Sequence, residues 1–409
     1  MDPLFRQRDF ALYLVVNVAR IAATQIVAVG VGWQVYAIHR DPFDLGLVGL
    51  AEFMPLPLLA LPAGHLADRF SRRLVLALSI VVSIGLTAGL LAVTISGAHA
   101  LWPFLLLSAL SGAANALGSP ASRALPPELV PAADLGTAFA LRSTTTQVGT
   151  VVGPALGGLL FAIRPELLYA SATGLFVLSL GCTLALHRRG GWVPGRDTPP
   201  ELAHVFGGIR FLRRSHVVLG AILLDLFAVL FGGAVALLPA FARSILHTGP
   251  LGLGVLRSAP AVGAIVAGAL LTRRPLEQRV GPALLATVTV FGASMIVFGL
   301  SKSFALSLGA LAVSGFADMV SVNIRSTTVA LATPDELRGR VNAVEMVFIS
   351  ASNQLGAFES GTAAALIGTA PAVVLGGVAT IAIALVWRQL FPSLTRLDRL
   401  DELRPEPAG

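Results

Sequence analysis

The sequence predicts an all-α polytopic membrane protein with twelve transmembrane helices. Of its 409 residues, 55% are hydrophobic and only 12% are charged, and the mean hydropathy is +0.80. A soluble domain does not need so much apolar surface. The apolar residues form twelve runs, each close to the roughly 20 residues that cross a bilayer. Lipid offers the backbone no hydrogen-bond partners, so each run is expected to be a helix.

The twelve expected spans follow one another along the chain. The first comes after a short polar stretch, Met1 to Asp9, and is too long for the apolar part of a cleavable signal. We therefore expect it to remain as a membrane span. The expected limits are 10–37, 45–66, 74–96, 101–122, 136–162, 167–187, 216–242, 250–272, 281–300, 304–330, 341–367 and 369–390.

The distribution of arginine predicts the orientation. Arginines gather before the first span, after the last span and in the loops that follow spans 2, 6, 8 and 10. The opposite side has Arg40, Arg164, Arg243 and Lys302. Loops rich in Lys and Arg stay in the cytoplasm. We expect a multi-pass protein with both termini in the cytoplasm.

Several function classes find no support in the sequence. Cys182 is the single cysteine, which excludes internal disulfides and cysteine-based metal sites. The chain has no phosphate-binding GxxxxGK(S/T) loop, no HExxH pair and no GxSxG elbow. We therefore expect no enzyme activity, no cofactor or metal, no drive by ATP and no nucleic-acid partner.

The chain is expected to divide into two halves joined by a linker. The linker begins with a polar stretch rich in Pro and Gly, and apolar residues at helical spacing follow. This pattern is typical of a short amphipathic helix on the membrane surface. The expected domains are an N-terminal six-helix bundle (1–187), the linker (188–215), a C-terminal six-helix bundle (216–390) and a cytoplasmic tail (391–409).

The two halves resemble each other in sequence. Residues 49–55 align with residues 254–260, and four charged positions change sign between the halves. Ion pairs that connect two pseudo-symmetric halves would leave this pattern, and chance alignment is the alternative. The aligned pairs are Arg20 with Asp225, Glu52 with Arg257, Arg72 with Glu277, and Arg142 with Glu345.

The loop between spans 2 and 3 carries Gly64, Asp68, Arg69, Arg72 and Arg73. This pattern resembles motif A of the major facilitator superfamily of transporters. An ordinary arginine-rich inside loop is the alternative. The resemblance implies the major facilitator fold, two pseudo-symmetric six-helix bundles with the substrate site between them. We also predict a cytoplasmic gate, in which Arg72 or Arg73 pairs with Glu345 and Arg142 pairs with Glu277.

Span 5 carries a Gly-rich pattern that is similar to motif C, the antiporter motif of exporters in this superfamily. Its residues are Gly149, Gly153, Pro154, Gly157 and Gly158. Small residues let helices approach closely, and proline bends a helix. An ordinary packing seam is the alternative.

Three further segments are similar to the branch of the superfamily that holds the enterobactin exporter and macrolide-efflux proteins. They are residues 119–123, 128–131 and 338–342. This resemblance implies efflux across the bacterial plasma (inner) membrane. One departure is that span 4 has no mid-helix arginine, which the drug/proton antiporters carry as motif B. This chain therefore does not have the arginine on which proton coupling in those antiporters depends, and we do not expect it to share their coupling scheme.

Charged and polar residues inside the spans are the candidates for binding substrate and protons. A charge at membrane depth costs at least ~2.5–3.5 kcal/mol, so it is functional or paired. The candidates are Arg20, Glu52, Asn115, Asp225, Arg257, Asp318 and Glu359. Asp225 and Asp318 are the preferred proton carriers, because burial raises a carboxyl pKa and a neighbouring arginine lowers it. A structural ion pair, such as Arg20 with Glu52, is the alternative.

These observations predict a secondary-active exporter of a small amphiphilic compound, either a drug or a siderophore-like molecule. It would work as a monomer by alternating access, with protons as the coupling ion. An importer or facilitator is the alternative, since fold does not determine function. A polytopic membrane enzyme is a third possibility. The sequence does not name the substrate.

Overall fold

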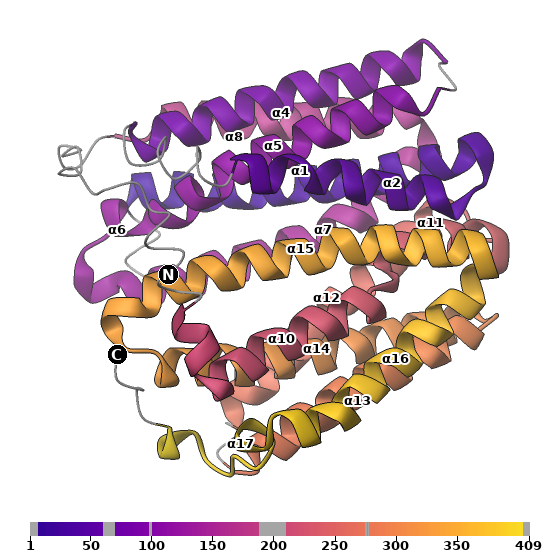
Figure 1. Ribbon diagram of the computed structural model, residues 1–409. Coiled ribbons are helices and arrows are strands. Elements are labelled where there is room, and N and C mark those ends of the chain that lie inside the picture. Colours follow the sequence, from indigo (N-terminus) through magenta and orange to yellow (C-terminus); the bar gives the residue numbers. More distant parts are fainter. Residues whose placement is uncertain are drawn as a thin grey trace. The chain divides into compact units, whose positions relative to one another are not determined.

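The computed structural model describes residues 7–59, 70–97, 100–187, 210–274, 276 and 278–403, and no strand occurs among them. The long helices (Figure 1) are α1 (Arg8–His39), α2 (Pro42–Phe53), α4 (Arg72–Ile95), α5 (Trp102–Ala124), α7 (Leu135–Ile163), α8 (Pro165–Leu184), α10 (His216–Gly232), α12 (Pro250–Arg273), α13 (Val280–Leu300), α14 (Phe304–Ala332), α15 (Asp335–Ile367) and α16 (Thr369–Leu390). Three short helices, α6 (Pro126–Leu129), α11 (Leu238–Ala240) and α17 (Pro392–Thr395), lie between or after them.

Each expected span overlaps a helix in the described residues. In the described part of the chain, 11 helical segments are long and apolar enough to cross a membrane. The twelfth helix, α15, is more polar because it carries Arg338, Arg340, Glu345 and Glu359. Its 33 residues extend about 50 Å at 1.5 Å per residue, which exceeds the roughly 30 Å of the bilayer core. The predicted all-α fold class is confirmed.

Two of the expected spans are interrupted. The seventh was expected to be continuous over 216–242, but α10 ends at Gly232 and Gly233 has a non-helical backbone. A 3-10 turn, α11 and a π-helical turn continue the chain to Ile245. Two adjacent glycines weaken a helix, and Pro239 provides no backbone donor. In the second span, α2 ends at Phe53, just before Pro55.

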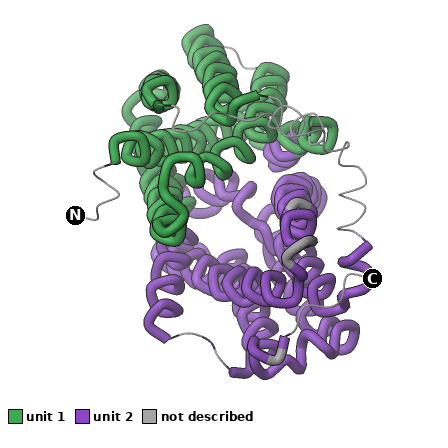
Figure 2. The backbone as a smooth tube through the Cα atoms, turned by 90° about the vertical axis from the view of Figure 1, so that its left-hand side faces the viewer, with its two compact units in different colours: residues 1–40, 50–199, 248–258 green, residues 41–49, 200–247, 259–409 purple. Residues whose placement is uncertain are grey.

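By its internal contacts the chain divides into two compact units (Figure 2). Unit 1 holds residues 1–40, 50–199 and 248–258, and unit 2 holds residues 41–49, 200–247 and 259–409. The predicted domain limits stay a prediction, because most of the expected linker, residues 188–209, lies outside the described residues.

The two units share one packing scheme. In unit 1, α1 packs against α7 and α8, and α4 packs against α5 and α8. In unit 2, α10 packs against α15 and α16, and α13 packs against α14 and α16. These pairs occupy equivalent places in a six-helix repeat, as expected for parallel repeats in this kind of transporter.

Contacts with α16 hold α10 in place on both sides of Asp225. The Trp387 indole N–H donates to the Gly220 carbonyl at 2.9 Å. One turn beyond Asp225, the Thr380 hydroxyl lies 3.4 Å from the Ala228 carbonyl. These bonds fix the rotation of α10, so the orientation of Asp225 is set by the packing of the unit.

Candidate functional site

Unit 2 contains a buried charged cluster built from α10, α14 and α15. The Arg325 side chain, only 5% exposed, forms an ion pair with Asp225. Its Nε also lies 3.5 Å from Glu345 Oε1. Asp318 is seven residues before Arg325, which places both side chains on the same face of α14, two turns apart. We call Asp225, Asp318, Arg325 and Glu345 the acidic cluster.

Asp318 differs from the other two carboxylates of the acidic cluster. It has no hydrogen bond or ion pair with any residue that the structure describes. Arg325 and Asp225 are nevertheless close enough to act on it electrostatically. Arg325 therefore pairs directly with Asp225 and Glu345, and it also interacts electrostatically with Asp318.

A small cavity opens at the acidic cluster. Asp225 and Asp318 line it with Thr287, Ser321 and Phe291. Its volume is about 10 Å³, which is close to the least space that can hold one water molecule. The cavity therefore suits a single water molecule, which can take part in a proton relay. No group of three His, Cys, Asp or Glu suited to a metal ion is found in the described ranges.

Arg325 is the member of the acidic cluster that sequence reasoning missed. The aligned position in the first half is Ser122, so the search for inverted charges does not find it. The available signal was its spacing, since it lies seven residues after Asp318 in an apolar helix.

Unit 1 contains a second polar cluster, at the contact of α1 with α5 and α7. Tyr13, Asn17 and Arg20 recur at helical spacing along one face of α1. The Tyr13 hydroxyl donates to the Ser122 carbonyl at 3.0 Å. Asn17 Nδ2 donates to the Arg142 carbonyl at 3.2 Å and to the hydroxyls of two threonines in the next turn of α7.

Three arginines gather in this region of unit 1. Arg20 is 9% exposed, and the groups that act on it are the Tyr13 hydroxyl and two further arginines, Arg142 and Arg123. The Arg142 guanidinium lies beside the Tyr13 hydroxyl. We call Arg20, Arg123 and Arg142 the basic cluster. Glu52 is not among the groups that act on Arg20, and it acts on Arg257 instead.

Glu52 and Arg257 attract each other within unit 1. The backbone around Glu52 is tightly packed, since a Cβ added to Gly112 would lie 2.1 Å from the Glu52 carbonyl oxygen. In the neighbouring contact, the Ser258 hydroxyl donates to the Val151 carbonyl of α7 at 2.7 Å. The Glu52–Arg257 pair thus lies at a close helix crossing.

The motif C glycines are packing residues in this structure. A Cβ on Gly153 would lie 3.0 Å from the Ala22 carbonyl oxygen, and a Cβ on Gly157 3.1 Å from the Ile26 Cα. Gly149 meets Ile21 in the same way, and Gly158 faces Gly254 of α12. Pro154 lies inside α7, between these contacts. The glycines allow α1 and α7 to approach closely, which supports the packing content of the motif.

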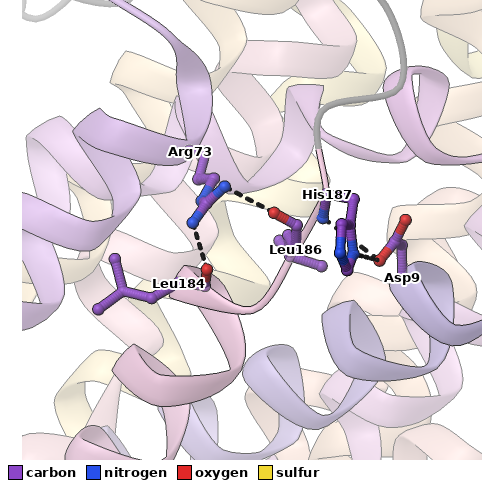
Figure 3. Close-up of polar contacts among 5 residues, drawn as sticks. All are labelled: Asp9, Arg73, Leu184, Leu186 and His187. Carbon is purple, nitrogen blue, oxygen red and sulfur yellow. Dashed lines mark hydrogen bonds and ion pairs between the residues drawn. The ribbon is translucent and has the colours of Figure 1, made fainter.

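Figure 3 shows one end of unit 1, where Arg73 lies. The Arg73 guanidinium donates to the Leu186 carbonyl at 2.6 Å and also contacts the Leu184 carbonyl. The His187 backbone N–H donates to Asp9 Oδ1 at 3.3 Å. Free carbonyls at a helix end commonly bind a cation. These contacts tie the end of α8 to α1 and α4.

The other predicted gate residues have different positions. Arg72 donates to the Ala124 carbonyl at 2.6 Å and pairs with Glu128 at 3.3 Å. Arg142 and Glu345 belong to the basic and acidic clusters. Gly64, Asp68, Arg69 and Glu277 lie outside the described residues. The gate pairings therefore stay a prediction.

Two predicted site residues lie apart from both clusters. Asn115 is exposed. Glu359 accepts a hydrogen bond of 3.3 Å from the Ser360 hydroxyl. Neither contacts the acidic or the basic cluster in the described structure.

Comparison with known proteins identifies the family. The family described as "Transmembrane secretion effector" matches residues 2–406. The "Enterobactin exporter EntS" of Citrobacter koseri is 28% identical over 423 aligned residues, which cover 100% of this chain and 95% of that protein. The protein of the same name from Escherichia coli O1:K1 is 29% identical over 84% of this chain and 80% of its own length.

Solved structures show the same fold at low sequence identity. A D-xylose-proton symporter matches with a TM-score of 0.72 and 14% identity, covering 95% of this chain and 98% of its own. A bacterial homologue of the iron transporter ferroportin, in an inward-facing state, matches with a TM-score of 0.71 and 17% identity over 95% and 99%. The chain is thus a multi-pass membrane transporter with the major facilitator fold, and not an enzyme. It belongs to the transmembrane secretion effector family.

Proposed function

We propose that this chain is a secondary-active exporter of a small amphiphilic compound, and that the acidic cluster of unit 2 couples export to H⁺ antiport. The observation that carries the proposal is the Arg325 side chain, which pairs with Asp225 and Glu345 while Asp318 stays without a direct partner among the described residues. A buried arrangement of this kind has more carboxylates than cations and can take up a proton.

Proton coupling follows from the imbalance of charge in the acidic cluster, in which three carboxylates share one arginine. Removing one partner of a buried ion pair is costly, because the remaining charge is left without compensation. A proton on Asp225 or Asp318 changes how strongly Arg325 is held, and the cavity beside them leaves room for a water that delivers it. The protonated and deprotonated clusters therefore stabilise different conformations, which is what a coupled transporter needs.

Glu345 connects the acidic cluster with the predicted gate. In the present structure it lies against Arg325. In the outward-open state, we propose, it pairs with Arg72 or Arg73, while Glu277 pairs with Arg142. Exchanging the signs in a double variant, Arg142→Glu with Glu277→Arg, should restore transport that each single variant loses. A double variant no better than either single one would contradict the pairing.

The substrate class is proposed from the relatives. Two curated relatives are named enterobactin exporters, so we propose a siderophore-like molecule and use enterobactin as the first probe. The direction of transport, from the cytoplasm outward in the bacterial inner membrane, comes from the same relatives. We also propose that both termini are cytoplasmic and that a monomer carries out transport.

Inside-out membrane vesicles test the proposal. An H⁺-coupled exporter should accumulate enterobactin in vesicles with an acidic lumen, and an uncoupler should abolish the accumulation. Asp318→Asn removes the proton-binding group and should abolish accumulation driven by the pH gradient, whereas Asp401→Asn in the tail should not. Equilibration without accumulation, or uptake driven by an alkaline lumen, would favour a facilitator or an importer.

A further inference from the structure

The basic cluster of unit 1 is not used in the proposed proton coupling, and two further arginines act on its buried member Arg20. We propose that Arg20 and Arg142 bind an anionic oxygen group of the transported molecule. This inference rests on the proposed export function and adds the chemical class of the substrate. It concerns a site inside unit 1, built from α1, α5 and α7.

Arg20 carries the argument. Its side chain is more than nine-tenths buried, and Arg20 Nε is shielded from solvent without a hydrogen-bond partner. No ion pair joins Arg20 to any residue in the described part of the chain. A buried, uncompensated charge is strongly unfavourable. A site that keeps one is therefore suited to a charge that arrives with a ligand.

The surrounding groups strengthen the same preference. Arg142 and Arg123 are further positive charges that act on Arg20, and Arg142 Nε is also buried without a hydrogen-bond partner. Exposure increases from Arg20, which is buried, through Arg142 to Arg123, which is exposed. The positive charge of Arg142 near the buried Arg20 favours an anion at this place.

Hydrogen bonds keep the site in shape without a ligand. Asn17 holds α1 against α7 at the Arg142 turn, and Tyr13 holds α1 against α5. The buried Asn17 Oδ1 has no hydrogen-bond partner and can accept from a ligand hydroxyl. Guanidinium groups bind carboxylates and related anions through two parallel hydrogen bonds. The best fit is a small acid with a neighbouring hydroxyl group.

An anionic lipid headgroup has the same chemistry, but depth favours a small solute. Arg20 is twelve residues from the first residue of α1, Arg8, or about 18 Å along the helix. Lipid headgroups stay at the surface of a hydrocarbon core about 30 Å thick. A soluble anion that enters the transport path can reach this depth.

Binding to the purified full-length chain tests the inference. Calorimetry in phosphatidylcholine nanodiscs compares salicylate, which is anionic, with neutral salicylamide and cationic benzylamine. Salicylate should bind to the native chain, and salicylamide and benzylamine should not. Arg20→Gln and Arg142→Gln should each weaken salicylate about tenfold or more, as expected for a lost charged hydrogen bond. Arg20→Lys should restore part of the affinity, and the exposed Arg164→Gln is the matched control.

Several outcomes would overturn the inference. The first is that the native chain and both glutamine variants bind salicylate with equal affinity. The second is that the native chain binds salicylamide as tightly as salicylate. The third is that the native chain binds phosphatidylglycerol in the nanodisc but does not bind salicylate. Circular dichroism shows whether each variant is folded, and the three-probe comparison on the native chain needs no variant. Arginine-dependent salicylate binding without enterobactin transport contradicts only the export proposal. Transport unaffected by Arg20→Gln contradicts only the inference.

Discussion

The acidic cluster of unit 2 and the basic cluster of unit 1 occupy related positions but have opposite composition. Arg20 of α1 aligns with Asp225 of α10, and Arg142 of α7 aligns with Glu345 of α15. In unit 2 an arginine links two acids, whereas in unit 1 the positive charges act on one another. The comparison teaches that one packing scheme can hold an arginine paired with two acids in one half and a buried arginine near further arginines in the other.

The largest expected effect is a difference in the free energy of unfolding between a variant of the acidic cluster and a variant of the basic cluster. Arg325→Gln leaves Asp225 and Glu345 buried without their partner, which should lower the free energy of unfolding by about 3–5 kcal/mol. Arg20→Gln is the matched control, because it removes a buried charge that has no ion-pair partner among the described residues. It should leave stability unchanged or raise it. Denaturation of both variants in the same detergent measures the difference, and equal losses would remove the contrast.

A smaller effect is expected from the glycine seam that places the basic cluster. Gly153→Val introduces a side chain at a position where even an added Cβ would lie 2.7 Å from the Gln25 Cβ. Overpacking of this kind costs about 1–3 kcal/mol, and it should move α1 away from α7 and weaken anion binding. Gly174→Val in α8 is the control, since nothing lies within 4 Å of its Cβ position. Similar melting temperatures for the two variants would show that the seam is not close-packed.

The smallest expected effect tests whether the burial of an ion pair determines how much its loss changes the free energy of unfolding. Arg72 pairs with Glu128 at 3.3 Å, with side chains 39% and 44% exposed. Arg325 approaches Glu345 at 3.5 Å, with side chains 5% and 15% exposed. Exposed pairs contribute about 0–1 kcal/mol. Arg72→Gln should therefore change the unfolding free energy by less than about 1 kcal/mol; a loss as large as that of Arg325→Gln would contradict the role of burial.

Much of the fold could be predicted because lipid restricts what the backbone can do. Apolar runs located the helices, and the ends of α12, α14 and α16 lie within two residues of the expected ones. The breaks after Phe53 and Gly232 were missed, although Pro55, Gly233 and Pro239 indicated them. Helical periodicity averages over such residues, so a long apolar run hides a local interruption.

The sequence by itself determined that this protein is a twelve-helix membrane transporter, and which side chains would be charged inside the membrane. Arg20, Asp225 and Asp318 were candidates because of their charge and depth in the expected spans, and Glu345 was a gate candidate because it aligns with Arg142 with the opposite sign. The physical reason is that the cost of burying a charge in lipid depends on residue type and position along the helix.

Only the tertiary structure decided which of these charges meet. Asp225 and Arg325 are 100 positions apart in the numbering and pair because α10 and α14 lie side by side. Asn115 aligns with Asp318 but is exposed and outside both clusters. Partner choice depends on how each helix is rotated against its neighbours, and distant packing contacts, such as that of Trp387 with Gly220, set that rotation.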